Sequence, residues 1–186
     1  MLPSLRPRPA LAAAALTAVF AVVLTAVGAY LSTSRPIPAY AAGPGAYRSV
    51  VAWTGKCMDV QAQWTADAAN VYEWDCVGSA ESQQWTFVPT GDGYYYIVAR
   101  HSGKCLDVAG GSNADEANVY QWTCAGGLNQ QWRLQEIPPG SGVVGYFIIA
   151  RHSNKCLDLY GGLTANETNI QQFTCTGGFT QKWRFA

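Results

Sequence analysis

The chain of 186 residues is 49% hydrophobic and carries 12 basic and 12 acidic residues. This length is enough for one domain with a full hydrophobic core, or for a smaller domain behind a targeting segment. The sequence has no polybasic stretch, which is the feature that nucleic-acid-binding proteins and proteins of anionic membrane surfaces usually show.

The first 41 residues have the layout of a signal peptide. Arg6 and Arg8 precede an apolar run over 10–31, and Ala39-Tyr40-Ala41 supplies the small residues that signal peptidase recognises. We predict cleavage after Ala41 and a secreted, extracellular mature chain. The apolar run is also long enough to span a bilayer as an uncleaved anchor, which is the alternative. Cleavage leaves nine basic and twelve acidic residues, a net charge of −3.

Behind a short linker over 42–46, one segment is repeated three times. Each copy contains, in this order, a Lys-Cys-Leu/Met-Asp motif, a second cysteine 19 residues after the first and a Gln-x-Trp motif. Turn-forming stretches at Thr90–Gly93 and Pro138–Gly142 separate the units. The repeats therefore cover about 47–89, 94–136 and 145–186, and a register kept three times indicates one structural unit used three times.

The composition of each unit predicts short β-strands. Segments rich in Val, Tyr, Trp and Thr alternate with Gly, Asn and Asp, and no segment after the leader keeps a helical apolar stripe over three turns. Units of about 40 residues rarely fold alone, and propellers typically need at least four blades. A β-trefoil closes with three four-stranded units, so we predict an all-β domain with this fold over 47–186.

All six cysteines lie after the leader, two in each repeat. In an exported chain they predict three disulfides, and repeat symmetry favours the pairs Cys57–Cys76, Cys105–Cys124 and Cys156–Cys175. A zinc site is the alternative, but gaps of 19 residues lack the Cys-x-x-Cys spacing of most zinc sites. We therefore predict no metal and no other cofactor.

Each repeat also places an aspartate and an aromatic residue on one face of a strand pair. With the two-residue period of a β-strand, Asp107 points away from the core side that holds Leu106, and Trp122 shares the face of Cys124. If the two cysteines are directly opposed, Asp107 lies opposite Trp122 with Cβ atoms about 5 Å apart. The same construction pairs Asp59 with Trp74 and Asp158 with Phe173.

A carboxylate beside an aromatic ring is suited to a sugar. The ring covers the C–H face of a pyranose, while the carboxylate accepts hydrogen bonds from neighbouring hydroxyls. In the second repeat Asn129 precedes Gln130 and can add an amide contact, whereas Ser82 and Thr180 hold this position in the other repeats. The structural alternative is that each carboxylate only accepts backbone N–H groups.

The chain resembles the ricin B-type lectins, also known as family-13 carbohydrate-binding modules, which adopt the β-trefoil. The resemblance covers roughly 47–185 and rests on the Cys-Leu/Met-Asp triplets, the strand before each second cysteine and the three Gln-x-Trp motifs. Gln171 and Asn129 match the polar positions of the family pattern, whereas Tyr72 and Tyr120 depart from it. The carbohydrate-binding residues predicted in this way are Asp59, Trp74, Asp107, Tyr120, Trp122, Asn129, Asp158, Gln171 and Phe173.

Other repeated side chains have a structural interpretation. The Gln-x-Trp tryptophans fill the core, and Gln83, Gln130 and Gln181 hold loops or orient the aspartates. Asn70, Asn118 and Asn169 open a strand, which favours turn chemistry over ligand contact. His101 and His152 occupy the position of Trp53, which favours packing. Asp115 and Glu116 are expected to be solvated charges.

We therefore expect a secreted, non-catalytic module that binds polysaccharides or sugars of the galactose, xylose or arabinose type. Outside the repeated positions there is no candidate nucleophile, and the three aspartates lie far apart around a trefoil, so glycosidase chemistry is not expected. The alternative is a trefoil that acts through protein contacts, as a protease inhibitor or as the targeting subunit of a toxin or enzyme. No nucleic-acid partner is expected, and no membrane partner after signal removal.

Overall fold

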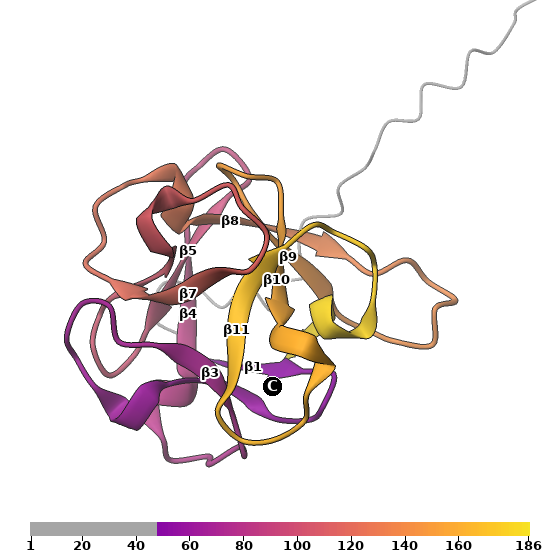
Figure 1. Ribbon diagram of the computed structural model, residues 1–186, viewed down its shortest axis with the longest axis horizontal. Helices are drawn as coiled ribbons and strands as arrows, with labels where there is room; N and C mark the ends of the chain where they lie inside the picture. The colour runs from indigo at the N-terminus through magenta and orange to yellow at the C-terminus, as the bar shows by residue number, and fades with distance from the viewer. Residues whose placement is uncertain (1–47) are drawn as a thin grey trace, which may run out of the picture. The chain divides into compact units, whose positions relative to one another are not determined.

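The computed structural model describes residues 48–186, so the predicted leader and linker lie outside the described residues. Twelve strands and six short 3-10 helices make up this part of the chain (Figure 1). None of the helices described in it is long and apolar enough to cross a membrane.

The strands are β1 (Arg48–Ala52), β2 (Cys57–Val60), β3 (Val71–Trp74), β4 (Gln84–Pro89), β5 (Tyr95–Ala99), β6 (Cys105–Val108), β7 (Ala117–Trp122), β8 (Gln131–Glu136), β9 (Tyr146–Ala150), β10 (Cys156–Leu159), β11 (Thr168–Phe173) and β12 (Trp183–Phe185). The 3-10 helices are η1 (Gln61–Gln63), η2 (Glu81–Gln83), η3 (Ala109–Gly111), η4 (Leu128–Gln130), η5 (Tyr160–Gly162) and η6 (Phe179–Gln181).

Six of the strands close into a barrel. β1 pairs with β4, β4 with β5, β5 with β8, β8 with β9, β9 with β12, and β12 with β1, all antiparallel. The hairpins β2–β3, β6–β7 and β10–β11 meet where β3, β7 and β11 contact one another, and the three repeats follow one another in colour around this centre (Figure 1). A six-stranded barrel capped by three hairpins is the β-trefoil, so the predicted fold is confirmed.

The three Gln-x-Trp tryptophans lie at the heart of the core. Trp85, Trp132 and Trp183 are fully buried within the apolar cluster that the barrel and the hairpins enclose. Their indole Nε1 atoms each donate to a backbone carbonyl at 3.0 Å, namely those of Met58, Leu106 and Leu157. The interior thus satisfies both the apolar ring and its polar atom, which confirms the core interpretation and removes these residues as ligand platforms.

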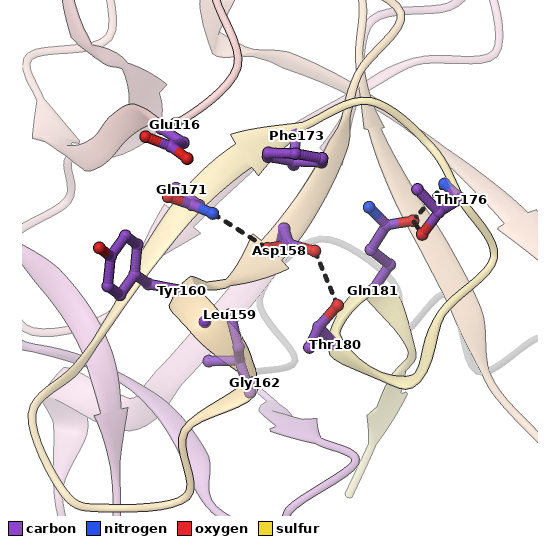
Figure 2. Close-up of a pocket in the computed structure, with 11 residues that line it drawn as sticks. Glu116, Asp158, Leu159, Tyr160, Gly162, Gln171, Phe173, Thr176, Thr180 and Gln181 are labelled. Carbon is purple, nitrogen blue, oxygen red and sulfur yellow. Dashed lines mark hydrogen bonds between the residues drawn. The ribbon is translucent and has the colours of Figure 1, made fainter.

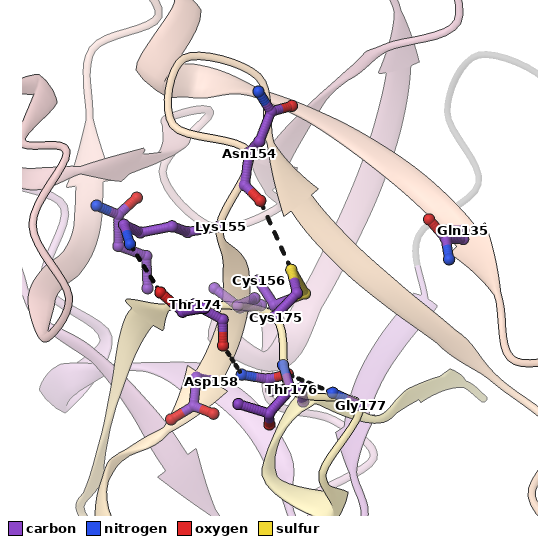
Figure 3. The surroundings of a disulfide bond; sticks show 12 residues. Gln135, Asn154, Lys155, Cys156, Asp158, Thr174, Cys175, Thr176 and Gly177 are labelled. Carbon is purple, nitrogen blue, oxygen red and sulfur yellow. Dashed lines mark hydrogen bonds between the residues drawn. A yellow bond between two sulfur atoms is a disulfide. The ribbon is translucent and has the colours of Figure 1, made fainter.

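The predicted disulfides Cys57–Cys76, Cys105–Cys124 and Cys156–Cys175 are all present. Figure 3 shows the disulfide of the third repeat. Beside it Lys155 Nζ donates a hydrogen bond to Thr174 Oγ1 at 3.0 Å. Each bond therefore ties the start of one hairpin strand to the segment that follows the other.

A closed ring of asparagine side chains joins the three repeats at the capped end. Asn118 donates to Asn70 (3.0 Å), Asn70 donates to Asn169 (3.0 Å) and Asn169 donates to Asn118 (2.9 Å), in each case from Nδ2 to Oδ1. Each amide is a donor to one neighbour and an acceptor from the other. The expected turn role is therefore wrong: these residues connect repeats that are distant in sequence.

A second set of contacts, here called the clasps, fastens each repeat to the next. In the first clasp, Asp67 Oδ1 accepts hydrogen bonds from the backbone N–H of Thr123 and from Lys104 Nζ, both at 2.7 Å. The second clasp repeats these contacts with Asp115, Thr174 and Lys155. Asp115 therefore accepts hydrogen bonds that join two repeats, and the expectation that it is a solvated charge is wrong.

The third clasp, which closes the trefoil from the third repeat back to the first, exchanges the two partners. Asn166 stands where the other clasps have aspartate, and Asp75 stands where they have threonine. Asn166 Oδ1 accepts from the Asp75 N–H and its Nδ2 donates to Asp75 Oδ2, both at 3.0 Å, while Lys56 pairs with Asp75. One carboxylate and one lysine are thus kept at every junction, although the carboxylate comes from the opposite repeat in the third.

The 3-10 helix that follows each aspartate-bearing strand uses the left-handed backbone region. Gly110 and Gly111 adopt φ values of 61° and 62° in the second repeat, and the third repeat also has glycines at these two positions. The first repeat has Ala62 and Gln63 there, with φ values of 51° and 55°. Because a Cβ atom makes this region unfavourable, the first repeat is strained where the other two are not.

Candidate functional sites

The hairpin register places each aspartate differently from the prediction. In the second repeat Cys105 is opposite Trp122, so Asp107 is opposite Tyr120 and diagonal to Trp122. The other repeats have the same register, with Asp59 opposite Tyr72 and Asp158 opposite Gln171. The expectation that Asp107 directly opposes Trp122 is therefore wrong by two residues. The prediction assumed that the two cysteines of the disulfide are directly opposed. Cys105 is instead opposite Trp122 and bonds to Cys124, which lies two residues beyond the end of β7. A shift of two residues keeps both side chains on one face.

In the second repeat the carboxylate of Asp107 is fixed by two amides. Asn129 Nδ2 donates to Oδ1 at 2.9 Å and Gln130 Nε2 donates to Oδ2 at 2.8 Å, and the side chain is only 4% exposed. Burial raises the pKa of Asp107, whereas the hydrogen bonds from Gln130 and Asn129 act in the opposite direction. A carboxylate offers about four acceptor positions, so two remain for a ligand. The structure thus brings together the residues that the sequence assigned to this site.

The first repeat supports its aspartate less completely. Gln83 Nε2 donates to Asp59 Oδ2 at 2.9 Å, as Gln130 does in the second repeat. Asp59 Oδ1 and the neighbouring Ser82 Oγ are buried and have no hydrogen-bond partner among the described residues. Serine is too short to repeat the contact of Asn129, which explains why one oxygen of this carboxylate stays free.

The third repeat holds its aspartate with different partners. Gln171 Nε2 donates to Asp158 Oδ1 at 3.1 Å and Thr180 Oγ1 donates to Oδ2 at 2.8 Å (Figure 2). Gln181 makes no hydrogen bond with this carboxylate; it keeps only the two loop contacts that Gln83 and Gln130 also make, with its Oε1 accepting from the Thr176 N–H at 2.8 Å and its Nε2 donating to the Thr174 carbonyl. Gln83 and Gln130 therefore orient an aspartate, whereas Gln181 only holds the loop.

The aromatic residues of the first two sites come as tilted pairs. The ring centroids of Tyr120 and Trp122 are 5.5 Å apart, and those of Tyr72 and Trp74 are 5.8 Å apart. The Tyr120 hydroxyl accepts a hydrogen bond from the Gly110 N–H at 3.2 Å, which fixes the ring, while Trp122 remains 39% exposed. A fixed tyrosine behind an exposed tryptophan makes a rigid apolar surface next to the carboxylate.

The third site is an open pocket of about 440 Å³. Phe173 and Gln171 lie on one side of Asp158, and Tyr160 lies on the other side of Gln171 (Figure 2). Glu116 also lines it, although this residue belongs to the second repeat. Tyr160 was not among the site residues predicted from the sequence, and Glu116 was expected to be a solvated charge. Tyr160 occurs two residues after the aspartate in this repeat alone, which was the available signal; Glu116 gave none, because its place follows from the contact between repeats.

The three sites share one chemistry. Each has a held carboxylate able to accept hydroxyl hydrogen bonds, next to an aromatic ring on the same face of a hairpin. Within residues 48–186 no cluster of three or more His, Cys, Asp or Glu side chains could hold a metal ion. The arrangement is suited to binding a polyhydroxylated ring.

Comparison with protein families gives one match. The family model described as "Ricin-type beta-trefoil lectin domain-like" matches residues 39–122 and 128–186. No curated protein sequence matches the chain.

Several solved structures are similar to the chain. A designed threefold-symmetric protein, ThreeFoil, is 45% identical over 75% of this chain and 97% of its own, with a TM-score of 0.69. An exo-beta-1,3-galactanase from Clostridium thermocellum is 34% identical over 77% of this chain, with a TM-score of 0.71, but only 30% of that enzyme is covered. The Rhizoctonia solani agglutinin shares the fold at 22% identity, over 76% of this chain and 94% of its own, with a TM-score of 0.64.

Proposed function

The chain belongs to the ricin-type β-trefoil lectin-like family, and from this premise we propose that it is a secreted module that binds polysaccharide through the three hairpin sites. The family and its relatives support carbohydrate binding in general. The finer proposal is that the ligand contains galactose-, arabinose- or xylose-type sugars. The galactanase is an enzyme of which this chain covers less than a third, so its title lends support to a galactose-type ligand only as a proposal.

The observation that carries the proposal is the second site. Asp107 is held by Asn129 and Gln130 at 2.9 and 2.8 Å, with the exposed Trp122 on the same face. A pyranose stacked on Trp122 would present hydroxyls to the two acceptor positions that the amides leave free. The amides also determine where those positions point, so the geometry selects neighbouring hydroxyls on one side of the ring.

Binding at each site should be weak, because a shallow surface buries little of a sugar. We expect dissociation constants of about 1 mM, equivalent to about −4 kcal/mol, for a monosaccharide. A polymer that reaches more than one site gains from effective concentration, by a factor of up to about 10² to 10⁴. Polysaccharides should therefore bind far better than their monosaccharides.

Affinity electrophoresis of the mature protein in gels that contain galactan, arabinan or xylan tests the proposal. Asp107→Ala should reduce retention more than the corresponding change of Asp59 or Asp158, because only the second site has both amides on its carboxylate. Trp122→Phe reproduces Phe173 of the third site and should keep most of the retention, whereas Trp122→Ala should not. If retention is the same for Asp107→Ala and the unmodified protein, the site assignment is wrong.

We also propose that the leader is removed after Ala41 and that the protein has no catalytic activity of its own. Disulfides in every repeat are consistent with an oxidising compartment. Amino-terminal sequencing of the exported protein should begin at Ala42. Release of reducing sugar from any polysaccharide that the purified protein binds would contradict the second part of this proposal.

A further inference from the structure

One polar contact near the barrel surface occurs at two of the three junctions between repeats. At the first junction Arg100 donates to Gln84 Oε1 at 2.5 Å, and at the second Arg151 donates to Gln131 Oε1 at 2.7 Å. In each case the arginine directly follows a barrel strand, β5 or β9, and its side chain reaches the first residue of the paired strand, β4 or β8. An arginine and a glutamine side chain thus fill the same space twice.

At the junction between the third and first repeats this pair is absent. Ala52 stands at the position of the arginine and Lys182 at the position of the glutamine. A cavity of about 280 Å³ lies there, lined by both residues and by Trp53, Phe179 and Val143. Replacement of the long arginine by alanine removes the side chain that fills this space at the other two junctions.

Two exposed aromatic rings form the wall of this cavity. The centroids of Trp53 and Phe179 are 6.1 Å apart, and the two side chains are 43% and 60% exposed. The residues equivalent to Trp53 are His101 and His152, whose Nε2 atoms lie 3.0 and 2.9 Å from backbone carbonyls of the preceding repeat. The histidines therefore serve the junction itself, whereas Trp53 presents an apolar ring to solvent. The two rings together offer an apolar surface on which the C–H face of a sugar ring can stack.

The charge at this cavity has one sign. Lys182 and Arg184 line it together with no acidic residue. Lys182 Nζ lies 4.4 Å from the centroid of Phe179, and neither cation forms an ion pair within the described residues. In contrast, the repeated lysines Lys56, Lys104 and Lys155 are all engaged in the clasps. A ligand that fits must offer an apolar face and a negative charge together.

We propose that this junction is a fourth carbohydrate site, distinct from the three hairpin sites, and that it binds a uronic acid residue of an acidic polysaccharide. The C–H face of the pyranose stacks on Trp53 or Phe179, and the carboxylate on C5 of the ring pairs with Lys182 and Arg184. The planar fork of an arginine matches a carboxylate well. The inference uses the proposed function only in taking a polysaccharide as the ligand, since none of its contacts involves the three aspartates.

Affinity electrophoresis in polygalacturonate and in neutral galactan separates the two kinds of site. Lys182→Gln introduces the residue that the other two repeats carry, so the fold should tolerate it. We expect it to weaken binding to polygalacturonate about tenfold, the loss of one charge-assisted contact, and to leave galactan binding unchanged. Trp53→His, again the residue of the other repeats, should have the same selective effect. Asp107→Ala should show the opposite pattern, with galactan retention reduced and polygalacturonate retention by this junction preserved.

Arg133→Gln is the matched control, because Arg133 holds the position of Arg184 in the second repeat, away from this cavity. It should leave polygalacturonate binding unchanged. The proposal is overturned if Lys182→Gln binds polygalacturonate like the unmodified protein, or if Arg133→Gln loses as much affinity, which would indicate attraction to the overall charge. Retention by dextran sulfate without retention by polygalacturonate would also overturn it. Failure in the galactan gels alone would contradict the hairpin sites and leave this inference standing.

Discussion

Glu73 is the residue whose replacement gives the sharpest test of the structure. It is fully buried in β3, at the position that Gln121 and Gln172 hold in β7 and β11. Gln121 Nε2 donates to the carbonyls of Trp64 and Ala66 at 2.8 and 2.9 Å, and Gln172 makes the equivalent pair of bonds at 2.7 Å each. A carboxylate has no N–H to offer in this place.

The substitution is compensated only in part. Thr54 donates to Glu73 Oε2 as Ser102 and Ser153 donate to the two glutamines. Thr168 of the third repeat donates to the Ala165 carbonyl at 2.7 Å, which replaces one of the two glutamine contacts. The Oε1 atom of Glu73 is buried without a hydrogen-bond partner. By the repeat equivalence, the acceptor left without its glutamine is the carbonyl of Leu163.

We therefore predict that Glu73→Gln stabilises the protein. The amide satisfies the orphaned position, and a buried polar atom without a partner costs about 1–3 kcal/mol. The free energy of unfolding at pH 7 should rise by about that amount, and the melting temperature by about 3–9 °C. Urea denaturation followed by tryptophan fluorescence, together with calorimetry, measures both quantities.

The effect should depend on pH in a defined direction. Burial raises the pKa of Glu73 above its ordinary value of 4.5, and the Thr54 hydrogen bond and the charge of Lys56 oppose that shift. The folded protein therefore binds this proton more tightly than the unfolded chain, so the contribution of Glu73 to stability is fully present below pH 4.5 and is lost as the pH rises through the raised pKa. The advantage of Glu73→Gln should be small near pH 4 and grow towards pH 7.

The exposed Glu136→Gln provides the control, since it removes the same charge at a solvated position and should change the stability little. Gln121→Glu is the reciprocal variant and should destabilise the protein with the same pH dependence. A Glu73→Gln protein that is no more stable than the unmodified one at pH 7, or whose advantage is the same at pH 4, would refute the reasoning.

Three further predictions concern stability. Asn118→Ala breaks two bonds of the asparagine ring and should lower the free energy of unfolding by about 1–3 kcal/mol in urea titrations, whereas the exposed Asn113→Ala should have little effect. Ala62→Gly removes the Cβ atom from a residue with a left-handed backbone and should raise the free energy of unfolding by up to about 1 kcal/mol. A variant less stable than the unmodified protein would mean that the strain is absent. The double variant Cys105→Ser/Cys124→Ser should cost about 2–4 kcal/mol, and an unchanged melting temperature would contradict a structural role for this disulfide.

Much of the fold could be predicted because the repeats state it three times. The cysteine spacing and the alternation around Leu106 were enough for the disulfides, the hairpins and the trefoil. The hairpin register was missed by two residues, because a disulfide can join a residue to the diagonal neighbour of its cross-strand partner as well as to the partner itself. Sequence periodicity determines the face on which Asp107 and Trp122 lie, but it does not distinguish registers that differ by two.

The site residues contributed from another repeat could not be predicted. Glu116 lines the third pocket and Asp115 fastens neighbouring repeats, yet the sequence predicted solvated charges at both positions. Their roles depend on which loops meet after the barrel has closed. A pattern analysed within one repeat holds no information on such contacts, whereas comparison of the three repeats in space reveals them at once.

The clasps determine whether the three units of this protein are interchangeable. The second repeat carries both an aspartate, Asp115, and the threonine partner, Thr123, so a protein built from three copies of this unit would keep every clasp. Three copies of the first unit would instead set Asp67 against Asp75 at each junction, with two carboxylates around one lysine. Three copies of the third would leave Lys155 facing Asn166 and no carboxylate at all. Only the middle unit would keep all three clasps when used three times, so the clasp contacts depend on the order in which the three units follow one another.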